Sequence, residues 1–181
     1  NVEKAIDRLK ASNLLAPDRL YRANPAIIAD RIRPTGFYNL KTRRLLAFLE
    51  FLHSNYNGQM EEMFREKTTE LRGKLLDVKG IGEETADSIL LYGDRRPVFV
   101  VDSYTRRMLE RHGLIDDAWS YGEIQTLFMA SPEVEESHYN QYHALIVNTG
   151  KKYCRTIPLC EGCPLQPLGD GVSRETLTRQ G

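Results

Sequence analysis

Residues 75–90 read LLDVKGIGEETADSIL, and this stretch decides how the rest of the chain is organised. An apolar segment ends at Val78, glycines follow at Gly80 and Gly82, and a helical pattern opens at Glu83. Glycine permits a tight turn and a close backbone approach, and the first N–H groups of a helix have no partner within it. The pattern predicts a helix–hairpin–helix whose amides bind a phosphate. An ordinary corner between two helices is the alternative, because short glycine motifs occur by chance.

The composition is that of a globular protein without a membrane partner. The chain has 181 residues, of which 41% are hydrophobic and 28% charged. No apolar run approaches the roughly 20 residues of a membrane span, and no signal peptide is visible. We therefore expect a cytoplasmic protein. The 25 basic and 25 acidic residues cancel, so any DNA-binding face must be local.

Helical periodicity dominates the sequence, and period-2 alternation is almost missing, so we predict an all-α fold. The N-terminal residues are in helical phase from Val2, and because the chain begins at Asn1 we expect an upstream segment. Asn39 is the predicted cap of a long helix that ends near Tyr56. Other helices are predicted over 2–12, 60–65, 104–111, 121–129 and 133–153, with one more from Pro25 and another leading into the hairpin.

Asp102 follows a short apolar run over 97–101 and begins a predicted helix. One interpretation is an N-cap, a position at which Asp is favoured. The other is a carboxylate that stabilises a sugar cation or activates a water molecule. The local sequence permits both interpretations.

Three motifs together resemble the endonuclease III branch of the helix-hairpin-helix DNA glycosylases. They are LLDVKGIGEETAD, VVDSYTRR and a C-x5-C-x2-C pattern, and the likeness runs from Asn1 to about Leu165. It implies a bilobed fold with DNA in the cleft: a six-helix barrel containing the helix-hairpin-helix over 1–97, and a second helical lobe with a cysteine loop over 98–181. It also implies a monomer that binds double-stranded DNA and flips out a damaged base.

The resemblance assigns roles to residues of the two lobes. Asp102 would be the catalytic aspartate, and the carbonyls of Leu76, Val78 and Ile81 would hold a monovalent cation, Na⁺ or K⁺. The residues expected at the DNA phosphates are Lys79, Gly80, Gly82, Glu84, Arg106 and Arg107.

A second resemblance narrows the subfamily. Residues 33–41, RPTGFYNLK, are similar to a stretch of the MagIII-type 3-methyladenine DNA glycosylases. Phe37, Tyr38, Asn39 and Lys41 would then line the base pocket, where an aromatic face favours a cationic alkylated purine. Alternatively, the two aromatics anchor the loop in the core. A Gln–Asn wedge of this subfamily would lie just before the residues that match Asn1.

Position 84 departs from the bifunctional relatives, which carry a lysine there as a Schiff-base nucleophile. A carboxylate cannot form an imine, so Glu84 predicts a monofunctional glycosylase with weak or absent lyase activity. The expected substrate is an alkylated purine such as 3-methyladenine. The alternatives are a glycosylase for oxidised pyrimidines or mismatches, and a relative that binds DNA without catalysis.

Three cysteines, Cys154, Cys160 and Cys163, indicate a metal site. The family holds a [4Fe–4S] cluster with four cysteines, and the fourth place here is Gly169. A cluster held by three cysteines and another ligand is possible. Zinc bound by three cysteines and a histidine is the alternative, although no histidine is close in sequence.

Overall fold

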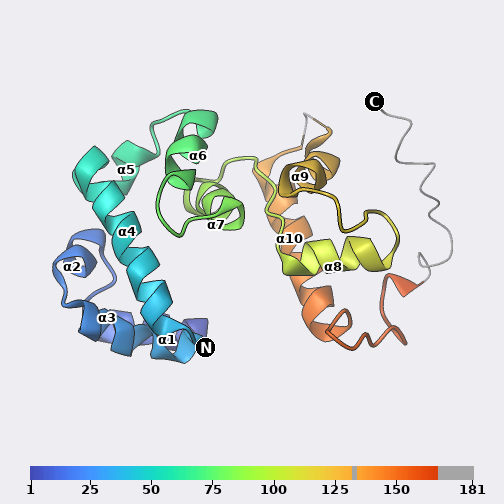
Figure 1. Cartoon of the computed structure of the whole chain (residues 1–181), viewed down its shortest axis with the longest axis horizontal. Coiled ribbons are helices and arrows are strands. Elements are labelled where there is room, and N and C mark those ends of the chain that lie inside the picture. The colour runs from blue at the N-terminus through green and yellow to red at the C-terminus, as the bar shows by residue number, and fades with distance from the viewer. Residues whose placement is uncertain (132–133, 167–181) are drawn as a thin grey trace. The chain divides into compact units, whose positions relative to one another are not determined.

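The computed structural model describes residues 1–131 and 134–166, and its regular elements are helices, which confirms the all-α prediction (Figure 1). The chain divides into two compact units, Asn1–Gly82 and Glu83–Gly181. The predicted lobe boundary lies after residue 97. The helix after the hairpin therefore belongs to the first lobe in the prediction and to the second unit in the structure. The lobe boundary at 97 stays a prediction.

The first unit contains one long helix, α4 (Tyr38–Tyr56), and three of the shorter helices pack against it, namely α2 (Pro17–Arg22), α3 (Pro25–Ile32) and α5 (Met60–Met63) (Figure 1). Its core is formed by side chains of α1 to α4, namely Ala5, Leu9, Leu20, Ile28, Ile32 and Leu49. The other elements are α1 (Val2–Ala11), η1 (Arg33–Thr35) and α6 (Thr68–Leu76).

Two local features of this unit differ from the sequence-based expectation. Helix α2 forms in a stretch for which no helix was predicted, because Pro17 suits a first helical turn and Leu20 is buried. The predicted cap at Asn39 is wrong: α4 begins at Tyr38, and its N-cap is Phe37, in the left-handed region at φ 47°. Asn39 lies inside the first turn and cannot occupy the cap position.

The second unit begins with α7 (Glu83–Ser88), which continues into a π-helical turn, η2 (Ile89–Gly93). Its other helices are α8 (Ser103–Arg111), α9 (Tyr121–Met129) and α10 (Glu136–Lys152). The apolar segment 98–101 is buried in its core, where the Phe99 ring stacks on Phe128 with centroids 3.8 Å apart. This buried segment fixes the position of Asp102, which follows it directly.

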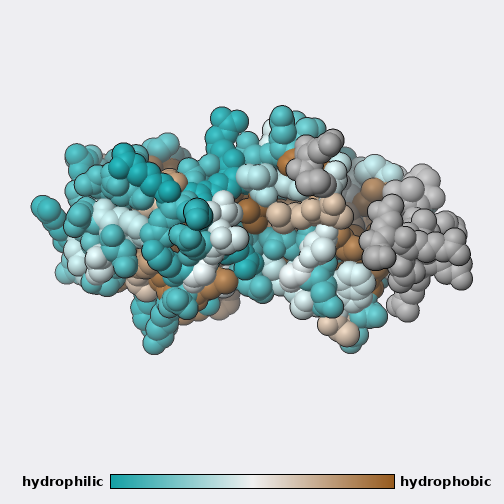
Figure 2. All heavy atoms as spheres, turned by 90° about the horizontal axis from the view of Figure 1, so that it is seen from above, coloured by the Kyte–Doolittle hydropathy of each residue, from teal (hydrophilic) through white to brown (hydrophobic). Residues whose placement is uncertain are grey.

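Helices α8 and α10 pack against each other (Figure 1). Gly150 of α10 makes this approach possible, since a Cβ atom added there would lie 2.5 Å from Cδ1 of Tyr104. Hydrophilic residues cover most of the face that Figure 2 shows. Among the described residues, no helix is long and apolar enough to cross a membrane.

Candidate functional site

The hairpin after α6 is a tight turn that depends on Gly80. Gly80 has φ +92°, and a Cβ atom there would lie 2.6 Å from Cγ of Arg44. The φ angle of Gly82 does not require glycine, and nothing lies within 4 Å of the place that a Cβ atom would take there. Val78 and Ile81 are buried and anchor the turn, while Lys79 is exposed. The turn therefore requires glycine at position 80, and position 82 offers room for a ligand to approach the backbone.

The predicted cation site uses carbonyls of the same turn. The Ile81 N–H donates to the Val78 carbonyl at 3.0 Å. The second lone pair of that carbonyl remains for a cation. Leu76, the other predicted donor in the approach to the turn, is the last residue of α6. The cation site at Leu76, Val78 and Ile81 stays a prediction.

Asp102 is the N-cap of α8, and its two oxygens have different environments. Oδ1 accepts hydrogen bonds from the Thr105 N–H at 2.7 Å and the Thr105 hydroxyl at 2.9 Å. Oδ2 lies 3.5 Å from Nε2 of His143. One oxygen therefore satisfies the helix terminus, and the other faces a titratable group. The capping interpretation is confirmed, and it leaves Oδ2 for chemistry.

The charge of Asp102 is stabilised although the side chain is only 10% exposed. Burial alone raises the pKa of this carboxyl, but the nearby His143 imidazole and the hydrogen bonds from Thr105 outweigh it and lower the pKa below its usual value. Asp102 is therefore ionised at neutral pH in a partly dehydrated position. Such a carboxylate can stabilise a developing positive charge more strongly than one in water.

Two residues of this site, His143 and Tyr92, were not identified from the sequence. Nδ1 of His143 is hydrogen-bonded to the Tyr92 hydroxyl at 2.5 Å. A signal existed: in α10, His143 has a helical spacing from the buried residues Tyr139 and Gly150, which marks the inner face. Nothing local to Tyr92 indicates its role, because the π-helical turn sets its direction.

Glu84 belongs to the same electrostatic environment. Burial of its carboxyl is the larger cause that raises its pKa, and the negative charge of Asp102 is the second, while the charge of His143 acts in the opposite direction. The residue as a whole is exposed, so only the carboxyl end is shielded. The side chain at position 84 thus lies within the field of Asp102.

The two predicted phosphate-binding arginines of α8 have internal partners. Nε of Arg107 donates to the Cys154 carbonyl at 2.8 Å, and its guanidinium lies 5.0 Å from the Tyr104 ring centroid. Arg106 lies 3.8 Å from a Glu110 carboxylate oxygen. Arg107 thus links α8 to the loop after α10, and the phosphate contacts of both arginines stay predictions.

In the loop of residues 33–41, whose residues were predicted to line the base pocket, the two aromatic side chains have different environments. The Phe37 side chain is 85% exposed, so it is no core anchor. Tyr38 packs against the core of the first unit, with the Arg33 guanidinium 5.7 Å from its ring centroid. Nζ of Lys41 donates to the Thr35 carbonyl at 2.8 Å, and Asn39 is exposed. Of the four residues, Phe37 and Asn39 are thus the freest to meet a ligand.

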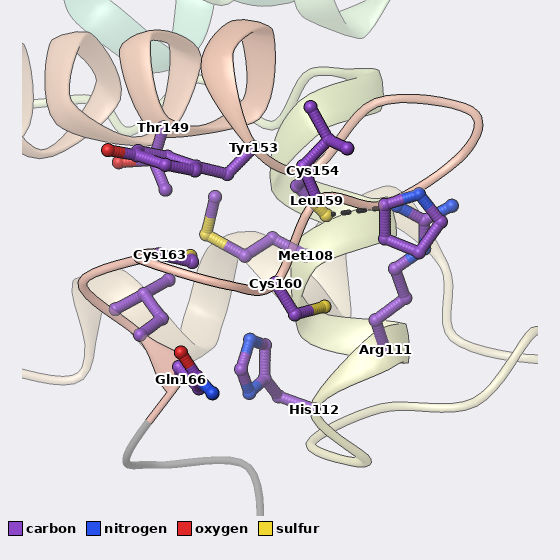
Figure 3. Close-up of a pocket in the computed structure, with 12 residues that line it drawn as sticks. Met108, Arg111, His112, Thr149, Tyr153, Cys154, Leu159, Cys160, Cys163 and Gln166 are labelled. Carbon is purple, nitrogen blue, oxygen red and sulfur yellow. Dashed lines mark hydrogen bonds between the residues drawn. The ribbon is translucent and has the colours of Figure 1, made fainter.

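The three cysteines line one cavity of about 260 Å³ next to α8 and α10 (Figure 3). All three are free thiols. His112, at the end of α8, lines the same cavity, although it is distant from the cysteines in sequence (Figure 3). Gly169, the expected fourth position, lies outside the described residues.

The side chains that line this cavity suit a metal centre that is bound mainly through thiolates. Three sulfurs and one imidazole are ligand types for zinc and for iron–sulfur clusters. In the described part of the chain, however, no three such side chains are close enough to hold one metal ion. Metal binding is therefore not shown, and Arg111, which donates to Sγ of Cys154 at 3.3 Å, gives that sulfur a positive neighbour.

Comparison with known proteins identifies the relatives of this chain. The model of the HhH-GPD superfamily of base excision DNA repair proteins matches residues 1–132. A candidate DNA repair glycosylase of Methanocaldococcus jannaschii is 44% identical over 92% of this chain and 76% of its own length. Endonuclease III of Sulfolobus acidocaldarius is 30% identical over 84% of this chain and 66% of its own length.

Solved structures agree with the family match. The crystal structure of the H. pylori 3-methyladenine DNA glycosylase MagIII bound to 1,N6-ethenoadenine has a TM-score of 0.74, with 29% identity over 83% of this chain and 77% of that one. A non-covalent endonuclease III–DNA complex has a TM-score of 0.73 at 23% identity, covering 92% of this chain and 73% of that one. The second likeness concerns the fold alone.

Proposed function

Because the chain belongs to the HhH-GPD superfamily of base excision DNA repair proteins, we propose that it is a monofunctional DNA glycosylase. It hydrolyses the N-glycosidic bond of a damaged base that is flipped out of double-stranded DNA. The observation that carries this proposal is the environment of Asp102: a carboxylate that is 10% exposed, accepts hydrogen bonds from Thr105 and is kept ionised beside His143.

The proposed reaction needs few protein groups. The bond between the sugar carbon and the base breaks, the base leaves with the bonding electrons, and water adds to the same carbon. The ionised Asp102 stabilises the positive charge that develops on the sugar. A cationic alkylated purine leaves as a neutral base, so it requires no general acid. Water releases a proton to solvent or to Asp102, and an abasic site remains.

DNA contacts are proposed for both units separately. In the first unit, exposed Lys79 and the backbone at Gly80 and Gly82 bind phosphate, supported by the open space at Gly82. The exposed ring of Phe37 stacks on a base, supported by the resemblance of residues 33–41 to the 3-methyladenine glycosylases. In the second unit, Asp102 performs the chemistry.

The proposed substrate class is an alkylated purine such as 3-methyladenine. The structural relative that binds 1,N6-ethenoadenine supports this choice. Oxidised pyrimidines are the second candidate, since a relative named endonuclease III is 30% identical. A DNA-binding relative without catalysis is the third. Duplexes carrying one lesion each separate the three, with release of the free base measured by chromatography.

The expected result is release of 3-methyladenine from alkylated DNA, without strand cleavage until the abasic site is treated with alkali. Release of an oxidised pyrimidine instead would favour the second candidate. Binding of every duplex without release of any base would contradict the proposal and favour the third. The Asp102→Asn variant is the control, because it retains a capping side chain and loses the charge.

We also propose that the cysteine cavity holds a [4Fe–4S] cluster bound by Cys154, Cys160 and Cys163. The support is the convergence of three free thiols on one cavity in a family that includes endonuclease III. Bound, such a cluster would cross-link the loop after α10, in which all three cysteines lie. Iron and acid-labile sulfide analysis of the purified protein tests this, and zinc without sulfide would contradict it.

A further inference from the structure

His143 links Asp102 to a tyrosine on a different element, and the family comparison assigns it no role. We propose that His143, oriented by Tyr92, is the positioning residue that holds the Asp102 carboxylate ready for base removal. This inference rests on the proposed glycosylase function. It adds to that function a series of contacts, Tyr92–His143–Asp102, in which the first is a hydrogen bond and the second a contact of 3.5 Å between Nε2 and Oδ2.

The hydrogen bonding of the imidazole defines which nitrogen faces the carboxylate. Either group can be the donor of the Tyr92–His143 hydrogen bond; we assign the Tyr92 hydroxyl as the donor to Nδ1 of the neutral ring, which places the ring proton on Nε2. Nε2 lies 3.5 Å from Oδ2 of Asp102 and is itself shielded from solvent, without an ideal hydrogen-bond partner. In the imidazolium, Nε2 also carries a hydrogen. In either protonation state, an N–H group therefore faces Oδ2.

Three elements hold this series in place. Asp102 is fixed by its bonds to Thr105 at the start of α8, and His143 lies on the inner face of α10. The π-helical turn η2 supplies Tyr92, and such a turn changes the direction of side chains relative to a regular α-helix. The Phe99 ring meets the imidazole edge to face, at 84° with centroids 6.5 Å apart.

Of the groups that contact the imidazole, only Asp102 takes part in the proposed reaction. Tyr92 from η2 and Asp102 from α8 meet its two nitrogens, Phe99 covers its face, and Glu84 from α7 acts through its charge. His143 is 13% exposed, so the pair is only weakly screened by water. The Tyr92–His143 pair thus positions the carboxylate and does not contact the substrate in the proposed reaction.

Removal of the imidazole should change both the rate and its pH dependence. Burial raises the pKa of the Asp102 carboxyl, and without His143 only the hydrogen bonds from Thr105 oppose this effect, so the pKa rises. Since a bond to a charged group is lost, base release should slow by about 10- to 100-fold at neutral pH. The acid side of the pH–rate profile should move to higher pH. Substrate affinity should change little, because the imidazole is not a substrate contact.

The experiment measures single-turnover base release by the full chain on alkylated duplex DNA between about pH 3 and pH 8, a range that includes the usual pKa of Asp. His143→Ala should show the slower rate and the shifted acid limb. His143→Gln, whose amide supplies an N–H without a titrating ring, should recover part of the rate. Tyr92→Phe should cause a smaller loss of rate, because the His143 imidazole remains but loses the hydrogen bond that orients it. His138→Ala, on the exposed side of the same helix, is the matched control and should behave as the parent.

Each outcome decides the inference. If the parent releases base and His143→Ala shows the parental rate and pH profile, the inference is overturned and the glycosylase function stands. If His143→Ala and His143→Gln lose activity equally and both unfold at a lower temperature than the parent, the role is structural and the inference also fails. If the parent releases no base from any lesion, the proposed function itself fails, and the positioning role falls with it.

Discussion

Glu84 is the single residue that separates base removal from strand cleavage in the proposed mechanism. Its carboxyl interacts electrostatically with Asp102, so a lysine at this position would extend toward the same site. We predict that Glu84→Lys forms a covalent DNA adduct that borohydride traps, whereas the parent does not, because an amine can form an imine. The adduct is measured by denaturing gel electrophoresis with labelled alkylated duplex.

Glu84→Gln is the control for that variant, since it removes the charge without adding an amine. It should remain free of the adduct. Base release by Glu84→Lys without any trapped adduct would show that position 84 does not reach the sugar, and the argument for a monofunctional enzyme would lose its main support.

Asp102 serves as a cap and as a catalytic group, and two substitutions separate these roles. Asn caps a helix about as well as Asp but carries no charge, so at neutral pH Asp102→Asn should lose only the stability that ionisation of Asp102 contributes, and it should lower base release by 100-fold or more, on the order of 3 kcal/mol of barrier. Asp102→Ala should lose activity and also about 0.5–2 kcal/mol of stability. Urea unfolding and base-release assays measure both.

The pH dependence of stability follows from the lowered pKa of Asp102. A carboxyl with a lower pKa in the folded state stabilises the fold above its unfolded pKa, and this contribution is lost as the pH falls through the folded pKa. The parent should therefore lose stability on acidification below the usual Asp range, and Asp102→Asn should lose less. Equal acid sensitivity of the two proteins would contradict the assignment.

At the scale of elements, the α8–α10 contact depends on Gly150. A Cβ atom there would lie 2.5 Å from Cδ1 of Tyr104, which a buried helix contact cannot absorb without a shift. We predict that Gly150→Ala destabilises the protein by about 1–3 kcal/mol, despite the better helix propensity of Ala. Differential scanning calorimetry measures the change, and the shift should also reduce activity, since α8 and α10 carry Asp102 and His143.

Gly73 in α6 is the matched control for Gly150. A Cβ atom there meets nothing within 4 Å, so Gly73→Ala should stabilise the protein by about 0.5–1 kcal/mol through helix propensity and the reduced entropy of the unfolded chain. Stabilisation by both substitutions would mean that α8 and α10 separate easily, and the close contact would then contribute little.

At the scale of the whole molecule, zero net charge means that DNA binding depends on a few local contacts. We predict that Lys79→Ala lowers the slope of log K against log salt by about 0.9, the effect of one lost phosphate contact. Lys74→Ala removes the same charge nearby, but Lys74 is bound to Glu66 at 2.5 Å, so its slope should stay parental. Fluorescence anisotropy with undamaged duplex measures both, and equal slopes for Lys79→Ala and the parent would exclude Lys79 from the phosphate contacts.

The sequence by itself determined the fold class, the hairpin and the cap at Asp102, because these depend on contacts between near neighbours in the chain. Gly80 and the buried run before Asp102 are local signals of this kind. Helix α2 and the start of α4 were missed, since a six-residue helix has little periodicity and since α4 is preceded by Phe37 in the left-handed region, which a bulky residue rarely adopts.

Only the tertiary structure decided which distant residues meet. It brings His143 and Tyr92 to Asp102, and His112 to the cavity of Cys154 and Cys160. These residues lie on separate elements, and their approach is set by the packing of α8 against α10 and by the π-helical turn, neither of which leaves a pattern in the local sequence. The charge environment that keeps Asp102 ionised is for that reason a property of the folded molecule.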